Sequence, residues 1–426
     1  MEKILRIVEK IIPRKLYQAS QPIYHWVMAF VGAVIYRFPA NELYVVGITG
    51  TKGKSSVTEM VNAILEEAGH KTISTGTIRF KIGDESRENK FKMSMPGRFF
   101  LQKLLREAVN KGCTHAVIEM TSEGSKFYRN RFIPTDAFIF TNLTPEHIES
   151  HGSFEKYKEA KLNIARNFKT KRQFNTKLNT QKETIGVINI DSPEHQEFYD
   201  VNFDRKIGYS ISDAKPLDLD KGIKMRFGKS TIYSNLDGEF NAYNILAAAS
   251  LCEAMEISHD HIRRGIENLT EIPGRVQKIK TNKGFDIIVD YAHTAESLEA
   301  LYKAFPKERK ICVLGNTGGG RDKWKRPFMA KVAEKYCDEI ILTNEDPYDE
   351  EPMEIIEQME SAIENKKPTV ILNRREAIHT AITKAGPKSV ILITGKGTDP
   401  YIMEAGGKKT PWSDYKVAQE ELSKLK

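Results

Sequence analysis

The sequence predicts an α/β protein with two doubly wound, mostly parallel sheets and a short helical segment before them. A β-branched run near residue 45 ends in a glycine-rich turn and is followed by an amphipathic helix. Short apolar runs then alternate with helical patterns, and the alternation starts again after Pro273-Gly274. This alternation is typical of parallel sheets with helices on both faces. We therefore expect a helical N-terminal segment (1–43), a central P-loop-type domain (44–272) and a C-terminal Rossmann-like domain (273–426).

Composition narrows the functional class. The 426 residues fit two or three domains of roughly 100–200 residues each. The formal net charge of +8 suits an anionic ligand such as a nucleotide, and also nucleic acid or an acidic membrane surface. The charges are spread out rather than clustered, so we expect small-molecule substrates and no nucleic acid. The cysteines at 113, 252, 312 and 337 form no CxxC pair and suggest no disulfide framework, which favours the cytoplasm.

The N-terminal segment has two apolar stretches. Within Met1–Ile12 the apolar residues recur at helical spacing, and after Pro13 the run Trp26–Tyr36 follows. That run is shorter than the roughly 20 apolar residues of a membrane span. Two alternatives stay open: helices packed on the next domain of a monomer, or an interfacial helix in peripheral contact with a membrane. In the second case anionic headgroups would be favoured by Lys3, Arg6, Lys10, Arg14 and Lys15.

In the central domain, Tyr44–Ile48 is predicted as a strand and Ser55–Ala68 as the helix that follows it. The polar, basic stretch Lys169–Lys182 is expected to be an exposed excursion. Further strands are predicted at Ala116–Glu119, Ala137–Thr141 and Ile185–Ile190.

The C-terminal domain repeats the alternation and has its own glycine-rich loop, "GNTGGGRDKWKRP". Its predicted strands are Asp286–Asp290, Ile311–Leu314, Glu339–Thr343, Thr369–Leu372 and Val390–Thr394.

The turn after the first strand, "GITGTKGKSS" (47–56), has the context of a phosphate-binding loop. The glycine that the pattern G-x-x-x-x-G-K-[ST] requires would fall at Ile48, so the standard form does not fit. Backbone N–H groups of such a loop and the positive end of the following helix bind phosphate oxygens. We expect Lys54 to reach the β- and γ-phosphates and Ser55 to bind Mg²⁺.

The loop and a series of later segments resemble the Mur ligase family, over about residues 44–420. The resemblance is strongest to UDP-N-acetylmuramyl-tripeptide synthetases, which add the third amino acid of the peptidoglycan stem peptide. Those enzymes have an N-terminal UDP-binding domain of about 100 residues, whereas 43 residues precede the strand that leads into the loop here. The segments that carry the resemblance are "VIEMTSEGSKFYR", "TNLTPEHIESHGSFEKYKEAKLNI", "LDGEFNAYNILAA", "IPGRVQ", "VDYAHTAESL", "NEDPYDEEP" and "GKGTDPY".

The resemblance implies ATP and Mg²⁺ as cofactors and assigns roles by position. Lys54, His147 and Lys161 would be catalytic, with Lys161 carbamylated so that it becomes an anion beside ATP. Ser55, Glu119 and His147 would hold Mg²⁺. The implied ATP contacts are Gly50, Thr51, Lys52, Gly53, Lys54, Ser55, Ser56, Asn241, Asn244, Arg275, Asp290 and His293. The implied substrate contacts are Thr121, Ser122, Arg129, Arg321, Asp346, Tyr348 and Asp399.

Two segments depart from the family pattern. Diaminopimelate-adding members have D-N-P-R where this chain has Glu345-Asp346-Pro347-Tyr348, so the arginine that reads a distal carboxylate is replaced. The later G-K-G-H-E is replaced by a sequence ending in Thr398-Asp399. An acidic pocket without that arginine favours an incoming side-chain amine, as in lysine or another diamine.

The sequence therefore predicts an ATP-dependent amide-bond-forming ligase that acts through an acyl phosphate on a muramyl-peptide-like acceptor. One alternative is a related ligase, of the folylpolyglutamate synthase or pseudomurein type. A second is a non-catalytic ATP-binding module, against which the joint presence of Lys54, Glu119, His147 and Lys161 argues.

Overall fold

A computed structural model describes residues 14–146, 148–169, 183–321 and 323–425. The chain divides into two compact units. The first unit comprises Met1–Gly50, Gly69–Leu143 and Glu155–Gly208, and the second comprises Thr51–Ala68, Thr144–Phe154 and Tyr209–Lys426. Parallel strands and helices alternate in both units, so the α/β class is confirmed. The domain limits at 43 and 272 stay a prediction, and the helical pattern of Met1–Ile12 lies outside the described residues.

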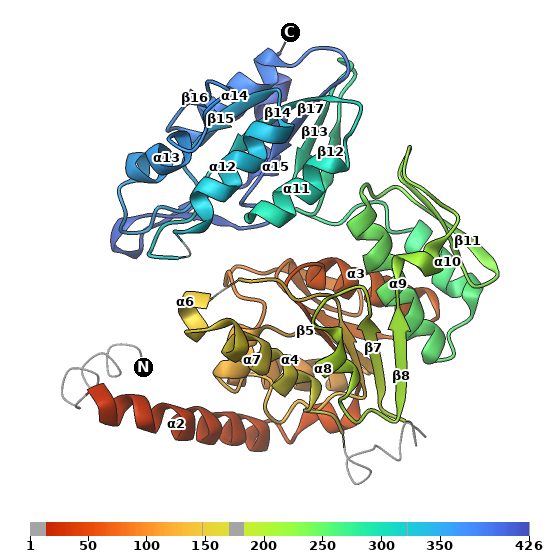
Figure 1. Ribbon diagram of the computed structural model, residues 1–426. Helices are drawn as coiled ribbons and strands as arrows, with labels where there is room; N and C mark the ends of the chain where they lie inside the picture. The colour runs from red at the N-terminus through yellow and green to blue at the C-terminus, as the bar shows by residue number, and fades with distance from the viewer. Residues whose placement is uncertain (1–13, 147, 170–182, 322, 426) are drawn as a thin grey trace. The chain divides into compact units, whose positions relative to one another are not determined.

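The first unit is built on an eight-stranded sheet of order β4-β3-β2-β5-β1-β6-β7-β8 (Figure 1). The central strand β1 (Tyr44–Thr49) pairs in parallel with β5 (His115–Glu119) and β6 (Ala137–Phe140). All six residues of β1 are buried, as expected for a β-branched strand covered on both faces. The other strands are β2 (Thr72–Thr75), β3 (Arg79–Ile82), β4 (Glu85–Glu88), β7 (Ile185–Asn189) and β8 (Arg205–Tyr209).

The predicted central strands are confirmed, but the antiparallel edge formed by β3 and β4 was not predicted. Strand β3 alternates over only four residues, with Phe80 and Ile82 buried, and β4 is polar and fully exposed. Such short strands give a weak pattern in the sequence. Helices and a 3₁₀ turn accompany this sheet: α2 (Arg14–Ile35), η1 (Pro39–Glu42), α4 (Arg98–Asn110), α5 (Ser122–Lys126), α7 (Phe154–Ala165) and α8 (His195–Tyr199).

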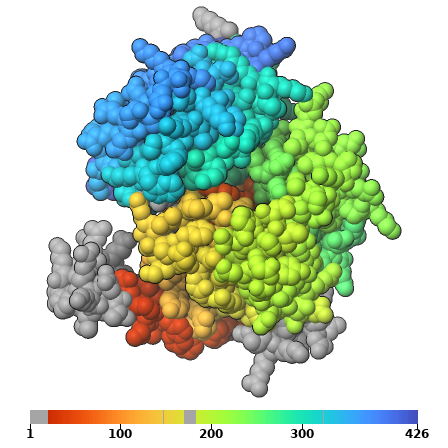
Figure 2. Space-filling view, in the orientation of Figure 1, coloured from red at the N-terminus to blue at the C-terminus, as the bar shows by residue number. Residues whose placement is uncertain are grey.

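Helix α2 packs on α4 through small residues and leaves a second apolar face exposed. Ala29 and Ala33 are buried, and Gly32 lies against the ring of Phe99. Other positions of α2 carry large apolar side chains that are exposed, although Trp26 and Phe30 also pack on the Phe132 ring. Helix α2 is the long red helix at the edge of the first unit (Figures 1 and 2). These exposed residues are Ile23, Tyr24, Trp26, Val27, Phe30, Val31, Val34 and Ile35.

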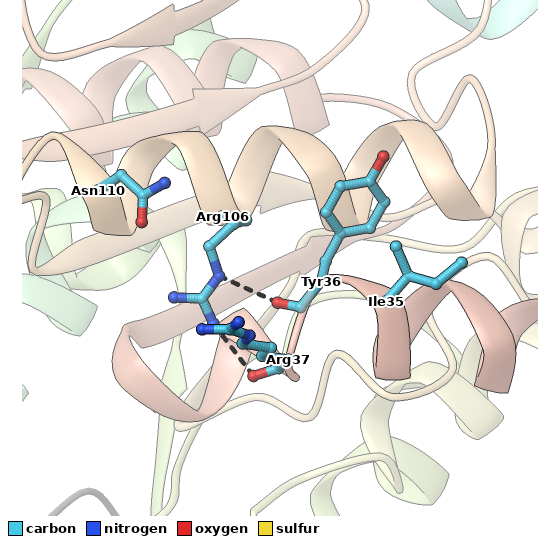
Figure 3. A pocket seen from close by; sticks show the side chains of 5 residues that line it. All are labelled: Ile35, Tyr36, Arg37, Arg106 and Asn110. Carbon is cyan, nitrogen blue, oxygen red and sulfur yellow. Dashed lines mark hydrogen bonds between the residues drawn. The ribbon is translucent and has the colours of Figure 1, made fainter.

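Arg106 of α4 holds the C-terminal end of α2. Its guanidinium donates to the carbonyl oxygens of Tyr36 and Arg37, both at 3.0 Å (Figure 3). It also pairs with Glu42 at 2.6 Å. A cation suits carbonyl groups left free at the end of a helix. A pocket of about 320 Å³ lies here, lined by these α2-end and α4 residues together with Ile35 and Asn110, and by none of the predicted site residues.

The second unit contains a helical layer and two further principal sheets. The first of these is three-stranded, with order β11-β10-β9, and the second is six-stranded, with order β12-β13-β17-β14-β15-β16. The five C-terminal strand predictions are confirmed to within about two residues. The strands are β9 (Leu217–Asp218), β10 (Ile223–Phe227), β11 (Ser230–Ser234), β12 (Gln277–Lys280), β13 (Asp286–Val289), β14 (Arg309–Leu314), β15 (Glu339–Leu342), β16 (Thr369–Val370) and β17 (Ser389–Ile393).

The helical layer packs closely where Gly265 of α10 lies against the backbone of Ile64 in α3. A side chain at 265 would meet the Ile64 Cα at 2.6 Å. The helices of this unit are α3 (Lys54–Glu67), α6 (Ile148–His151), α9 (Glu239–Ala254), α10 (His259–Glu267), α11 (Ala295–Lys303), α12 (Lys325–Tyr336), α13 (Pro352–Glu360), α14 (Arg374–Lys384) and α15 (Asp414–Ser423). The small elements η3 (Ile211–Ala214), β18 (Tyr401–Met403), η4 (Ala405–Gly407) and β19 (Lys409–Pro411) complete it.

Two expectations are wrong. Cys312 and Cys337 form a disulfide, although 25 positions separate them in the sequence. Cys312 lies on β14 and Cys337 just before β15, and these parallel strands are neighbours in the sheet. Lys169 is buried rather than exposed, because its ammonium pairs with Asp136 at 2.8 Å and donates to the carbonyl of Leu43. The rest of that predicted excursion, 170–182, lies outside the described residues.

Candidate active site

The predicted phosphate loop joins β1 to α3. Its glycines serve the backbone: Gly50 has φ +151° and Gly53, which precedes α3, has φ +84°. A Cβ at Gly50 would lie 1.9 Å from the Thr141 hydroxyl oxygen. Both positions favour glycine over residues with a side chain. The strand–loop–helix context predicted for this segment is confirmed.

Two lysines of the loop have distinct partners within the second unit. Lys54 donates to the carbonyl of Thr51 at 2.9 Å, and Lys52 pairs with Glu146 at 3.0 Å. The same Glu146 oxygen lies 2.9 Å from the Nε2 of His293. Burial first, and then the positive charge of Lys52, lowers the pKa of His293 to about 4.

Lys161 of α7 is brought to the loop, within the first unit. Its Nζ donates to the carbonyl oxygen of Gly50 at 2.6 Å and lies 4.8 Å from the centre of the Tyr157 ring. Only 2% of the side chain is exposed. Lysine is rarely buried to this degree, so Lys161 is not an ordinary surface lysine.

Glu119 lies at the end of β5, buried in a set of donors from the first unit. Its carboxylate accepts from the Thr77 amide, the Thr77 hydroxyl and the Ser94 hydroxyl, each at 2.9 Å. Gly76 leaves room beside it, because a Cβ there would be 2.8 Å from a Glu119 oxygen. His147, the other implied ligand, lies outside the described residues, and those residues contain no group of three or more histidine, cysteine or acidic side chains placed to hold a metal.

The residues implied to contact the acceptor also lie in the first unit, and they follow Glu119 closely in the sequence. Thr121 caps α5 by accepting from the Gly124 amide at 3.1 Å, and Ser122 is buried. Arg129 donates to the carbonyl of Met95 at 2.6 Å. Met95 follows Ser94, so one short segment connects the surroundings of Glu119 with Arg129.

The implied adenosine contacts lie in the second unit. Asn244 donates to the Asn241 amide oxygen at 3.0 Å, and both are buried in α9. Gly238 is the N-cap of α9, so Asn241 lies inside the helix. Arg275 donates to the Ser55 hydroxyl at 3.2 Å. The Asp290 carboxylate accepts the amides of Val276 and Ala292 at 2.7 Å, and burial raises its pKa.

The carboxyl ends of β14, β15 and β17 carry the residues implied for the incoming amino acid, where open α/β sheets bind ligands. Asp346 pairs with Lys396 at 2.7 Å and accepts the Met403 amide. Lys396 also lies 3.6 Å from Asp399. Arg321 lies over the Tyr348 ring at 5.2 Å.

Glu345, next to Asp346, was not singled out from the sequence. One of its oxygens accepts from Thr317 at 2.8 Å, and the other is buried without a hydrogen-bond partner among the described residues. Burial, and then the nearby charge of Asp346, raises its pKa. Thr77, Ser94, Glu146 and Lys396 were missed too. They act through other side chains, and no local pattern marks such residues in a sequence.

Sequence comparison matches both halves of the described chain to known domains. The Mur ligase middle domain matches residues 48–252, and the glutamate ligase domain of Mur ligases matches residues 274–397. The UDP-N-acetylmuramoyl-L-alanyl-D-glutamate–2,6-diaminopimelate ligase of Bacillus cereus is 33% identical over 411 residues, which cover 93% of this chain and 81% of that protein. The enzyme of the same name from Bacillus licheniformis is 34% identical over 412 residues, with coverage of 94% and 82%.

Solved structures share the fold. The Mycobacterium tuberculosis folylpolyglutamate synthase has a TM-score of 0.70 at 16% identity, covering 89% of this chain and 96% of that one. A pseudomurein peptide ligase type C from Methanothermus fervidus has a TM-score of 0.60 at 20% identity, with coverage of 90% and 79%. With its phosphate loop, buried lysine and matched domains, the chain belongs to the Mur ligase family and is an ATP-dependent ligase that forms amide bonds.

Proposed function

We propose that the chain joins an amino acid with a side-chain amine, such as lysine, to a muramyl-peptide-like acceptor in the synthesis of a cell-wall precursor. The observation that supports this most directly is the segment Glu345–Tyr348. It occupies the carboxyl edge of the C-terminal sheet with two acidic residues, and Tyr348 stands where diaminopimelate-adding relatives have an arginine. The relatives' names support the muramyl-peptide acceptor.

The reaction proceeds in two steps. A carboxylate oxygen of the acceptor attacks the γ-phosphorus of ATP, the bond to the β,γ-bridging oxygen breaks, and ADP leaves. The amine then attacks the acyl phosphate carbon, inorganic phosphate leaves with its C–O bond broken, and the amine loses a proton. Lys54 and the loop amides hold the phosphates, and Arg321 holds the carboxylate of the incoming amino acid. Bidentate arginine suits that task.

The residues present fit Mg²⁺. Mg²⁺ prefers hard oxygen ligands and keeps several waters, so one or two carboxylates suffice. The Glu119 carboxylate is fixed by three donors at the end of β5 and packs closely on Gly76. We infer that Glu119, Ser55 and His147 hold the ion, which neutralises charge on the transferring phosphoryl group.

Lys161 is proposed to carry a carbamate. The modification would convert a buried ammonium beside the phosphate loop into an anion. The hydrogen bond from Lys161 to the Gly50 carbonyl supports this proposal, because it places the modified nitrogen next to the loop. Carbamylation adds CO₂ to the neutral amine with loss of a proton.

The acidic edge of the C-terminal sheet is less negative than the sequence suggests, because Lys396 pairs with Asp346. The carboxylate left to meet a substrate amine is that of Glu345, whose second oxygen has no partner among the described residues. Tyr348 and Asp399 would complete the contact. This arrangement favours a diamine over an amino acid with a second carboxylate.

The test is an ADP-release screen. UDP-N-acetylmuramoyl-L-alanyl-D-glutamate and a folate are each offered with lysine, ornithine, diaminopimelate and glutamate. We expect release only with the muramyl acceptor and a diamine. Release with folate and glutamate would instead establish a folylpolyglutamate synthase, which the shared fold also allows. A non-catalytic module would release no ADP with any pair.

We further propose a monomer that acts in the cytoplasm, where ATP and the precursors are made. In the part of the chain that the structure describes, no helix has both the length and the apolar character needed to cross a membrane. The packing of α2 on α4 supports the structural alternative for residues 14–35. The exposed face of α2 leaves peripheral membrane contact as the alternative to be tested.

A further inference from the structure

Basic side chains from three elements of the first unit meet around Phe127. His25 comes from α2, Arg98 is the first residue of α4, and Arg129 follows α5. We call His25, Arg98 and Arg129 the basic triad. Only Arg129 was expected to contact a substrate.

The basic triad is held in place by backbone and ring contacts. Arg98 donates through Nε to the carbonyl of Phe127 at 2.9 Å and through Nη2 to Nδ1 of His25. Arg129 donates to the carbonyl of Met95, and its guanidinium lies 5.6 Å from the centre of the Phe127 ring. The His25 ring packs edge-on against the same ring at 5.3 Å.

The two arginines carry positive charge that no ion pair in the described part of the chain neutralises, although the charge of Glu123 acts against burial and raises the pKa of Arg129. Among the described residues, no carboxylate forms an ion pair with either guanidinium. Burial and the charge of Arg129 lower the pKa of Arg98, and burial lowers that of Arg129. Each arginine has five N–H donors, and the contacts above use only some of them. An anion would therefore find both charge and donors here.

His25 adds a donor on a ring that is only partly exposed. Arginine can only donate, so Nδ1 of His25 accepts and the ring proton of the neutral form is on Nε2. Burial, followed by the charges of Arg98 and Arg129, lowers the pKa of His25 to about 4, so the ring is neutral at pH 7. Its Nε2 is buried without a hydrogen-bond partner among the described residues. A buried N–H left unpaired is costly, and a ligand oxygen would satisfy it.

We propose that the basic triad binds an anionic group of the acid acceptor, a carboxylate or a phosphate, and that α2 supplies one of the donors. The identity of the acceptor rests on the proposed function. The position supports it: Arg129 holds the carbonyl of Met95, and the preceding Ser94 holds Glu119. The anion site and the inferred Mg²⁺ ligand thus share one segment of the chain, as an acceptor that spans both would require.

The test measures binding rather than turnover. UDP-N-acetylmuramoyl-L-alanyl-D-glutamate is titrated calorimetrically into the full chain, with Mg²⁺ and a saturating non-hydrolysable ATP analogue to occupy the phosphate loop. We expect Arg98→Gln and Arg129→Gln each to weaken binding by about tenfold or more, the usual effect of losing a charged hydrogen bond. Arg131→Gln is the matched control, because the Arg131 side chain lies over Phe132 instead and should leave binding unchanged.

His25 is tested with a pair of variants. His25→Leu removes the donor and should weaken binding, whereas His25→Gln keeps an N–H donor and should retain most of the affinity. Arg98→Lys, which keeps a cation and a donor, replaces Arg98→Gln if that variant does not fold, and should bind with intermediate affinity. A merely structural role would lower the melting temperature in these variants and leave the dissociation constant unchanged.

The source of the anion follows from the two halves of the probe. UDP, which carries the phosphates, and L-alanyl-D-glutamate, which carries the carboxylates, are titrated separately into the wild type and Arg98→Gln. The compound that binds Arg98→Gln more weakly than the wild type contains the group that the basic triad binds. If folded Arg98→Gln and Arg129→Gln bind the whole probe as tightly as the wild type does, the anion-site proposal is wrong. The proposed function still stands in that case, provided that the wild type releases ADP normally.

A separate measurement tests the anion site if the proposed function is wrong. If no acceptor supports ADP release, the His25 ring resonance is followed by NMR during titration with inorganic phosphate and with malonate, again with the phosphate loop occupied. A saturable shift that is lost in Arg98→Gln supports the anion site, and the absence of any shift overturns it.

Discussion

The ammonium of Lys161 donates a 2.6 Å hydrogen bond to the carbonyl oxygen of Gly50. This contact connects α7 to the phosphate loop across 111 positions of the sequence. The lysine is 2% exposed, and we propose that it carries a carbamate. The contact places the Lys161 nitrogen beside the loop, where a carbamate would be an anion.

Lys161→Ala should abolish ADP release while the fold persists, and short carboxylic acids such as acetate should restore part of the activity by supplying the missing anion. Lys54→Ala is the control, because it removes phosphate-binding charge that a carboxylate cannot replace. It should be inactive with and without acetate. An unmodified Lys161 in the native protein by mass spectrometry and ¹³C NMR, together with a fully active alanine variant, would refute the carbamate.

Gly50→Ala should destabilise the protein and stop ATP binding. The added Cβ would lie 1.9 Å from the Thr141 hydroxyl, at a φ of +151° that disfavours side chains. We expect a loss of about 2 kcal/mol or more in the free energy of unfolding, as for overpacking in a close-packed site. Urea denaturation measures it.

Gly69→Ala is the matched control for that substitution. Gly69 also has a positive φ of +85°, but nothing lies within 4 Å of its added Cβ. Only the backbone penalty of about 1 kcal/mol remains. Thr141→Ala should rescue Gly50→Ala in part, and equal destabilisation of Gly50→Ala and Gly69→Ala would contradict the steric argument.

Tyr348→Arg should shift the choice of incoming amino acid. The new guanidinium stands where diaminopimelate-adding relatives have an arginine and can bind a distal carboxylate, while it repels a side-chain amine. We expect the ratio of kcat/KM for diaminopimelate to that for lysine to rise about tenfold or more, the usual effect of a charged contact. The KM for ATP should not change. An unchanged ratio would show that this segment does not face the distal end of the substrate.

Acid should weaken the fold partly through His25. Its pKa is about 4 in the folded protein and near 6.5 in an unfolded chain, so the unfolded state binds more protons between these values. Stability therefore falls as the pH falls from about 6.5 to 4. The slope should stay well below the single-proton limit of about 1.4 kcal/mol per pH unit, because the ring is partly exposed and screened.

His25→Gln should flatten that pH dependence, since glutamine does not titrate. Urea midpoints of the two proteins at pH 7.0, 6.0 and 5.0 measure the difference. If both proteins lose stability in parallel over this range, His25 does not titrate as the structure indicates.

The sequence predicted the parallel strands and the loop because both depend on local chemistry. Apolar β-branched runs mark β1 and β5, and the spacing of Gly50 and Gly53 marks the phosphate loop. The basic triad could not be predicted in the same way. His25 and Arg98 are 73 positions apart, and only the packing of α2 on α4 brings them together. The neutralisation of Asp346 by Lys396 across 50 positions was missed for the same reason.

The two faces of α2 should respond differently to polar substitution. Ala33 is fully buried on the first unit, so Ala33→Gln should cost about 2 kcal/mol or more of stability by burying an unsatisfied amide in a packed interface. Ile23, Val27 and Val34 lie on the outward face and are 69%, 42% and 47% exposed. The triple change of these three to glutamine should alter stability by about 0.5 kcal/mol or less per site and leave ADP release unchanged.

Flotation with anionic vesicles tests the outward face of α2 for membrane contact. Salt-sensitive binding by the wild type that the triple variant lacks would establish such contact. We expect neither protein to float, because Ala29, Gly32 and Ala33 already anchor α2 to α4.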